Sequence, residues 1–149
     1  MNQIGIGKVG ILTILGAIGA FISSLFGGWD QALTTLIIFM AIDYLTGLLV
    51  AGVFHKSSKS ESGALESRAG WKGLCRKGMT LLVVFVAVRL DIATGTTYIK
   101  DAVVIAYVVN EALSIIENAG LMGLPIPEVI KKAIEVLRGK TEGSEVKNE

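Results

Sequence analysis

The feature that most constrains this chain is a series of four long apolar segments, at residues 9–26, 32–54, 74–92 and 102–122. The first, VGILTILGAIGAFISSLF, carries no charge. It forms a helix of about 27 Å at about 1.5 Å per residue, long enough to cross the hydrocarbon core of a bilayer. Asp43 alone interrupts the second segment, whereas charges shorten the apolar runs of the third and fourth. The pattern predicts an all-α integral membrane protein with about four transmembrane helices.

Composition favours the same class. Hydrophobic residues make up 52% of the 149 residues and the mean hydropathy is +0.62. Charged residues make up 18%, below the roughly 25% of a soluble domain. A formal net charge of +1 gives no basic excess that would indicate a nucleic-acid partner.

Lysine and arginine alternate between the connections, which predicts the orientation. The first connection, GGWDQ, has none, and the third has Lys100. The second and the C-terminal region are basic, with Lys56, Lys59, Arg68, Lys72, Arg76 and Lys77 in one and Lys131, Lys132, Arg138, Lys140 and Lys147 in the other. Both termini and a basic loop at 55–73 are therefore expected in the cytoplasm. A cleaved signal peptide is the alternative for the first segment, but that run is long and no A-x-A site follows it.

The C-terminal region predicts two further parts beyond the transmembrane domain, 1–122. Residues 123–139 form an amphipathic helix that begins at Pro127 and ends at Gly139, and it lies on the membrane surface or packs on a partner. Residues 140–149 are expected to be disordered. The serine-rich stretch from 57 to 67 is expected to be a mobile spacer.

The fourth segment contains an unusual polar stripe. At 100° per residue, its polar side chains fall within one arc of about 120°, and they are Tyr107, Asn110, Glu111, Ser114, Glu117 and Asn118. Apolar residues fill the rest of the helix. Such a stripe must face other helices or water, so these residues are candidates for lining a pore or a helix interface.

Two acids lie near the middle of predicted spans, Asp43 in the second and Glu111 in the fourth. An acid at such a depth costs about 2.5–3.5 kcal/mol on insertion scales, so it usually faces the bundle interior or a wet cavity. In the predicted topology the two acids lie at similar depth. Arg89, in the third segment, either reaches one of them or extends to the outer interface.

Small residues recur every four positions in the first two segments. The rows are Gly16, Ala20 and Ser24; Gly19, Ser23 and Gly27; and Gly47 and Ala51. Such rows allow close backbone approach between membrane helices. They serve either packing within one bundle or association between subunits.

Enzymatic function is not expected. The sequence has no HExxH, GxSxG or phosphate-binding loop. One histidine, His55, and one cysteine, Cys75, supply neither a metal site nor a paired nucleophile. No cofactor and no metal are predicted.

Four blocks of the sequence resemble the phage holins of the toxin-secretion and phage-lysis type, from phages and prophages of Gram-positive bacteria. They are MAIDYLTGLLVA (40–51), SRAGWKGLCRKG (67–78), LD (90–91) and NEALSIIENAGLMGLPIP (110–127). The resemblance covers most of residues 33–138. The longer serine-rich stretch at 57–66 departs from the family pattern.

The resemblance implies a multi-pass protein of the bacterial cytoplasmic membrane that associates with itself and opens lesions at a set time. These lesions release a cell-wall hydrolase, the endolysin, with which direct binding is not expected. Two alternatives remain: a holin-like exporter of a large protein, and an ion-conducting channel or transporter subunit that uses Asp43 and Glu111.

Overall fold

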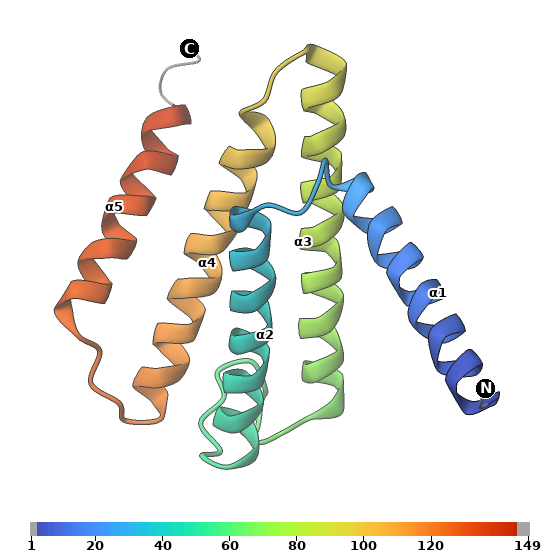
Figure 1. Cartoon of the computed structure of the whole chain (residues 1–149). Helices are drawn as coiled ribbons and strands as arrows, with labels where there is room; N and C mark the ends of the chain where they lie inside the picture. The colour runs from blue at the N-terminus through green and yellow to red at the C-terminus, as the bar shows by residue number, and fades with distance from the viewer. Residues whose placement is uncertain (1–2, 146–149) are drawn as a thin grey trace. The chain divides into compact units, whose positions relative to one another are not determined.

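The computed structural model describes residues 3–145, and within that range it leaves out the side chains of residues 3–6, 138 and 140–145. Five helices follow one another, and the described residues contain no strand: α1 (Gln3–Leu25), α2 (Gln31–Gly52), α3 (Ser67–Thr94), α4 (Ile99–Leu121) and α5 (Glu128–Glu145). In Figure 1 the colour follows these helices along the chain, from blue in α1 to red in α5. The predicted all-α class is confirmed.

Two compact units make up the chain, residues 1–30 and residues 31–149. The first consists of α1, whose large apolar side chains are exposed, with Leu12 at 68%. By length and composition, two helices can cross a membrane, α1 over Gly7–Leu25 and α2 over Gln31–Gly52. Among the described residues, these two helices are the candidate membrane spans. Spans through α3 and α4 and the cytoplasmic termini remain predictions.

In the second unit, α4 is the central helix. It contacts α2, α3 and α5. Helices α2 and α4 run in the same direction, while α3 and α5 run in the opposite direction (Figure 1). Leu33 and Leu36 of α2, Val84 of α3 and Val104 of α4 are almost completely buried. Apolar packing between these three helices therefore forms the core that holds the polar residues in place.

Asp91, near the end of α3, organises the turn into α4. Its carboxylate accepts hydrogen bonds from the backbone N–H groups of Ile99 and Lys100, at 3.0 and 2.8 Å. The hydroxyl of Thr96 donates a third, at 2.6 Å. The first N–H groups of a helix have no partner within the helix. Asp91 supplies such partners and fixes the antiparallel pairing of α3 with α4.

The serine-rich connection between α2 and α3 is folded, in contrast to the predicted mobile spacer. The amide of Ser57 donates to the carbonyl of Gly63 at 2.9 Å, and the Ser60 hydroxyl donates to the carbonyl of Ala64 at 2.8 Å. Gly63 has φ +72, and a Cβ there would lie 2.6 Å from the carbonyl oxygen of His55. Only glycine fits this position. Serine composition was misleading because the hydroxyls close the loop on itself.

Helix α5 differs from its predicted bounds. It begins at Glu128, directly after Pro127, and continues through Gly139 to Glu145. A glycine costs a helix about 1 kcal/mol relative to alanine, which weakens a helix without ending it. The predicted disorder of 140–149 therefore does not hold for 140–145, and residues 146–149 lie outside the described residues. Ile134 of α5 packs against Val109 and Ala112 of α4, so the partner of this helix is α4.

Replacing Asp91 tests its part in the α3–α4 turn. In Asp91→Ala the amides of Ile99 and Lys100 lose their acceptors, so their hydrogen exchange should accelerate several-fold. Asp91→Asn keeps one oxygen acceptor and should give a smaller change. Hydrogen exchange of the detergent-solubilised protein measures both, with the amide of buried Val104 as the internal reference. Unchanged exchange at Ile99 and Lys100 in Asp91→Ala would contradict this role.

Candidate site: a buried charge cluster

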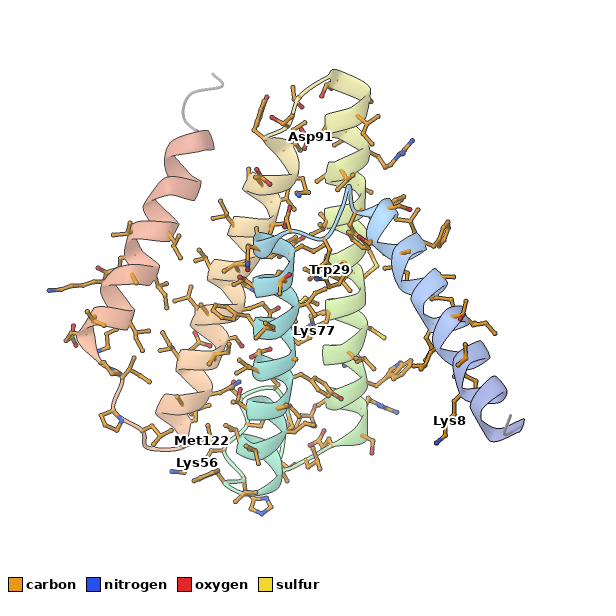
Figure 2. The ribbon with its side chains drawn as sticks, viewed as in Figure 1. Lys8, Trp29, Lys56, Lys77, Asp91 and Met122 are labelled. Carbon is orange, nitrogen blue, oxygen red and sulfur yellow. The ribbon has the colours of Figure 1, made fainter. Side chains whose placement is uncertain are left out.

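A lysine between two acids forms the centre of the site. The Nζ atom of Lys77 lies 2.8 Å from Oδ2 of Asp43 and 2.5 Å from Oε2 of Glu111. The three side chains come from three helices, α3, α2 and α4. Figure 2 shows Lys77 between these helices. One ammonium group therefore ties the three central helices together.

All three charged side chains are largely hidden from the surroundings. The exposed fraction is 13% for the Lys77 side chain, 8% for Asp43 and 7% for Glu111. A buried charge is tolerated when it is paired and hydrogen-bonded. Because two carboxylates share one ammonium, the cluster retains an excess of negative charge that further donors must stabilise.

Asn118, about two turns beyond Glu111 on α4, supplies such a donor. Its Nδ2 atom donates to Oδ1 of Asp43 at 3.1 Å and to the Thr46 hydroxyl at 2.9 Å. Gly47 lies beside this amide: a Cβ at that position would lie 3.8 Å from the same Nδ2 atom, an ordinary van der Waals contact.

A second lysine reaches the cluster from the folded loop. Lys59 donates to the Ser114 hydroxyl at 3.3 Å, and its Nζ atom lies 3.8 Å from Oδ1 of Asp43. Its side chain is 49% exposed, so solvent screens this contact more than that of Lys77. With Lys59, two ammonium groups balance the two carboxylates.

The cluster forms the floor of a cavity of about 590 Å³ between α2, α3, α4 and the loop. Lys59, Lys72 and Arg76 are among its basic residues, and Glu66 and Glu117 are among its acidic ones. The charged part of such a cavity holds water or the polar part of a ligand. Among the described residues, no group of three histidine, cysteine or acidic side chains is suited to hold a metal ion.

The residues of the predicted polar stripe differ in how far they are buried within the protein. Glu111 and Asn118 are buried and take part in the cluster, and Ser114 and Tyr107 are half-buried. Asn110 and Glu117 are exposed, and both line the cavity. Asp43 lies beside Glu111 across their shared lysine. Whether this stripe ever lines a pore stays a prediction.

Other predicted site residues lie apart from the cluster. Arg89 is exposed, and the basic partner of both acids is Lys77. On α1, Gly16, Gly19, Ala20 and Ser24 are exposed and Ser23 is half-buried, while Gly27 is exposed and lies beyond the end of the helix at Leu25. On α2, Gly47 and Ala51 face the bundle, with Ala51 buried to 7% exposure. The small row on α2 thus lies inside the bundle, and its use in association between subunits stays a prediction.

Sequence reasoning missed Lys77, Lys59 and Thr46. Lys77 lay inside the predicted third segment, yet it was counted among the basic loop residues that set orientation. The available signal was the charge balance, because two intramembrane acids at one depth require a cation at that depth. The basic residues within the third segment are Arg76, Lys77 and Arg89. No comparable signal pointed to Lys59, whose position depends on how the loop folds.

Comparison with known proteins identifies the family. The model of the bacteriophage holin family matches residues 20–139. A probable holin of Bacillus phage phi105 is 34% identical over 111 residues, which cover 74% of this chain and 76% of the phage protein. The chain belongs to the bacteriophage holin family.

Two bacterial proteins are also similar to this holin-family chain. An uncharacterized 14.9 kDa protein of Clostridium perfringens is 38% identical over 141 residues, which cover 93% of the chain and 98% of the relative. An uncharacterized protein of Halalkalibacterium halodurans is 40% identical over 128 residues, 82% of the chain and 89% of the relative. No solved structure matches this holin-family chain.

Removing the charge of Lys77 should destabilise the bundle. Lys77→Met leaves Glu111 without its counter-ion and Asp43 with only the partly exposed Lys59, and breaking a buried pair in this way typically costs about 3–5 kcal/mol. Thermal unfolding in detergent should show a large loss. Adding Asp43→Asn and Glu111→Gln to Lys77→Met should restore much of it, because no unpaired charge remains.

Arg76→Gln is the matched control for that loss. It removes a positive charge next to Lys77 in the sequence, but Arg76 is exposed, so the unfolding temperature should change little. Equal losses in Lys77→Met and Arg76→Gln would contradict a special role for the buried lysine.

Proposed function

We propose that this protein is a holin that associates with itself in the bacterial cytoplasmic membrane and forms lesions through which an endolysin reaches the cell wall. The observation that carries the proposal is the charge cluster of Asp43, Lys77 and Glu111, enclosed by helices of a holin-family chain. Such a cluster gives one chain two possible surfaces, a closed one with its charges hidden and an open one with its charges hydrated. Because the chain belongs to the holin family, we infer that the change between these two surfaces serves cell lysis.

In the proposed topology, α1 to α4 cross the membrane and both termini lie in the cytoplasm. Within the second unit, Lys56 and Met122 lie at one end of the bundle and Asp91 at the other (Figure 2). This arrangement supports a cytoplasmic face at the basic loop and the end of α4, and an outer face at the α3–α4 turn. The orientation follows the positive-inside rule.

The proposed opening step is the departure of α3 from the α2–α4 pair. Helix α3 contributes the central ammonium group. Its contact with α2 is less extensive than the contact between α4 and α2. When α3 moves, Asp43 and Glu111 lose their partner and require water. Association of several subunits around such hydrated stripes produces a polar lesion, whereas separate closed subunits remain compatible with lipid.

A fixed ion channel is the second candidate, because a polar cavity leads to paired ionisable groups at the depth of Glu111 and Asp43. A channel and a holin differ in what they let through. A channel passes small ions selectively, while a holin lesion passes a folded enzyme. The two outcomes separate in one experiment.

That experiment is induced expression in bacteria, with and without a separately encoded cell-wall hydrolase that lacks its own export signal. We expect optical density to fall abruptly only when both proteins are present. Loss of membrane potential without hydrolase release would instead support the ion channel. Release of a large protein while the cells keep growing would support an exporter.

Glu111→Leu tests the stripe within that assay. Lys77 keeps Asp43 as a partner in this variant, so the closed bundle and membrane insertion should persist. Removing one of the two charges that require water should delay or abolish lysis. Fractionation confirms insertion and optical density follows lysis, and lysis at the unchanged time would remove Glu111 from the opening step.

A further inference from the structure

Three cations follow one another along one face of α3. Arg68, Lys72 and Arg76 are spaced four residues apart, which places them on the same side of a helix. All three are exposed. The acids of the central cluster pair with Lys77 and Lys59 instead. This row presents positive charge that the central cluster does not neutralise.

The row borders two neighbouring hollows. Arg68 and Lys72 line one of about 220 Å³, together with Lys59. Lys72 and Arg76 line the 590 Å³ cavity, again with Lys59. Lys59 and Lys72 line both hollows, so the two lie next to each other and together form a recess between α3 and the folded loop.

Hydroxyl-binding and apolar groups complete the recess. Glu61 and Glu66 line the smaller hollow, and their carboxylates can accept hydrogen bonds from hydroxyl groups of a ligand. Leu65, Met79 and Val83 line the larger cavity and are exposed to 56%, 58% and 39%. One ligand that contacts all of these groups carries an anion, hydroxyls and a hydrocarbon chain.

The depth of the recess matches that of lipid headgroups. Helix α3 has 28 residues, or about 42 Å, which exceeds the roughly 30 Å hydrocarbon core. Trp71, between Arg68 and Lys72, is 66% exposed, and exposed tryptophans favour the membrane interface. The first turns of α3 therefore lie at the cytoplasmic headgroup level when this helix crosses the membrane.

We propose that the recess formed by the start of α3 and the 57–66 loop binds an anionic phospholipid. Its phosphate contacts Arg68, Lys72 and Arg76, its headgroup hydroxyls face Glu61 and Glu66, and an acyl chain follows Met79 and Val83. Basic pockets beside membrane helices on the cytoplasmic side recognise lipid headgroups in this way. The inference rests on the membrane placement of α3 given under the proposed function.

The test uses Trp71 as the reporter. Trp29→Phe leaves Trp71 as the one tryptophan. The protein is reconstituted into phosphatidylcholine vesicles that contain an equal fraction of brominated phosphatidylglycerol or brominated phosphatidylcholine. We expect stronger quenching by the anionic lipid. Each basic residue contributes about 1 kcal/mol, or about a five-fold change in affinity, so the preference should be at least several-fold.

Two charge variants decide whether the recess causes the preference. Arg68→Gln, Lys72→Gln and Arg76→Gln together should abolish it. Lys56→Gln, Lys131→Gln and Lys132→Gln remove the same charge from exposed positions outside the recess, and this control should keep it. Equal losses in both variants would assign the preference to overall charge and overturn the site.

Other outcomes distinguish a lipid ligand from a soluble phosphate ester, and failure of the site from failure of the membrane placement of α3. Equal quenching by both lipids overturns the site while leaving the lysis proposal intact. Displacement of the brominated lipid by soluble glycerol 3-phosphate would assign the recess to a water-soluble phosphate ester and contradict the lipid. No quenching by either lipid would overturn the site and the membrane placement of α3 together. Lysis in the hydrolase assay is read independently of all three.

Discussion

One ammonium group between two carboxylates is the interaction on which the second unit depends. Lys77 contacts Asp43 and Glu111 at 2.8 and 2.5 Å, and each of the three residues comes from a different helix. Inside the bundle, where the dielectric constant is low, removing one of these three charges leaves another unpaired. An unpaired buried charge costs several kcal/mol. The cluster therefore favours two states of the helices, one with every charge paired and one with every charge hydrated.

The central position of α4 follows from its composition. This helix carries the polar stripe on one side. Helices α2 and α3 and Lys59 of the loop cover the buried part of that stripe. Its other side packs against Ile134 of α5. A helix shielded on so many sides does not need the uniform apolar surface of α1.

The sequence predicted the helices well because apolar segment length and helix-breaking residues are local features. Asp43 and Glu111 were also recognisable, since an acid within an apolar run is costly wherever the chain folds. Lys77 was not recognised, because a lysine near the end of a span has two uses and only tertiary packing decides between them. The loop was misjudged for a related reason: Gly63 and the carbonyl of His55 fit together in space, which composition does not show.

The most direct test of the central claim is to hold α3 against α2 and watch for lysis. A Cβ at Gly73 would lie 3.9 Å from the ring of Tyr44, so Gly73→Cys with Tyr44→Cys, in a Cys75→Ser background, places two thiols within reach of a short membrane-permeant disulfide-forming cross-linker. Cross-linked cells should not lyse when the hydrolase is present, and a reductant should restore lysis, while each single-cysteine control lyses normally. Lysis at the unchanged time with complete cross-linking would contradict the departure of α3 as the opening step.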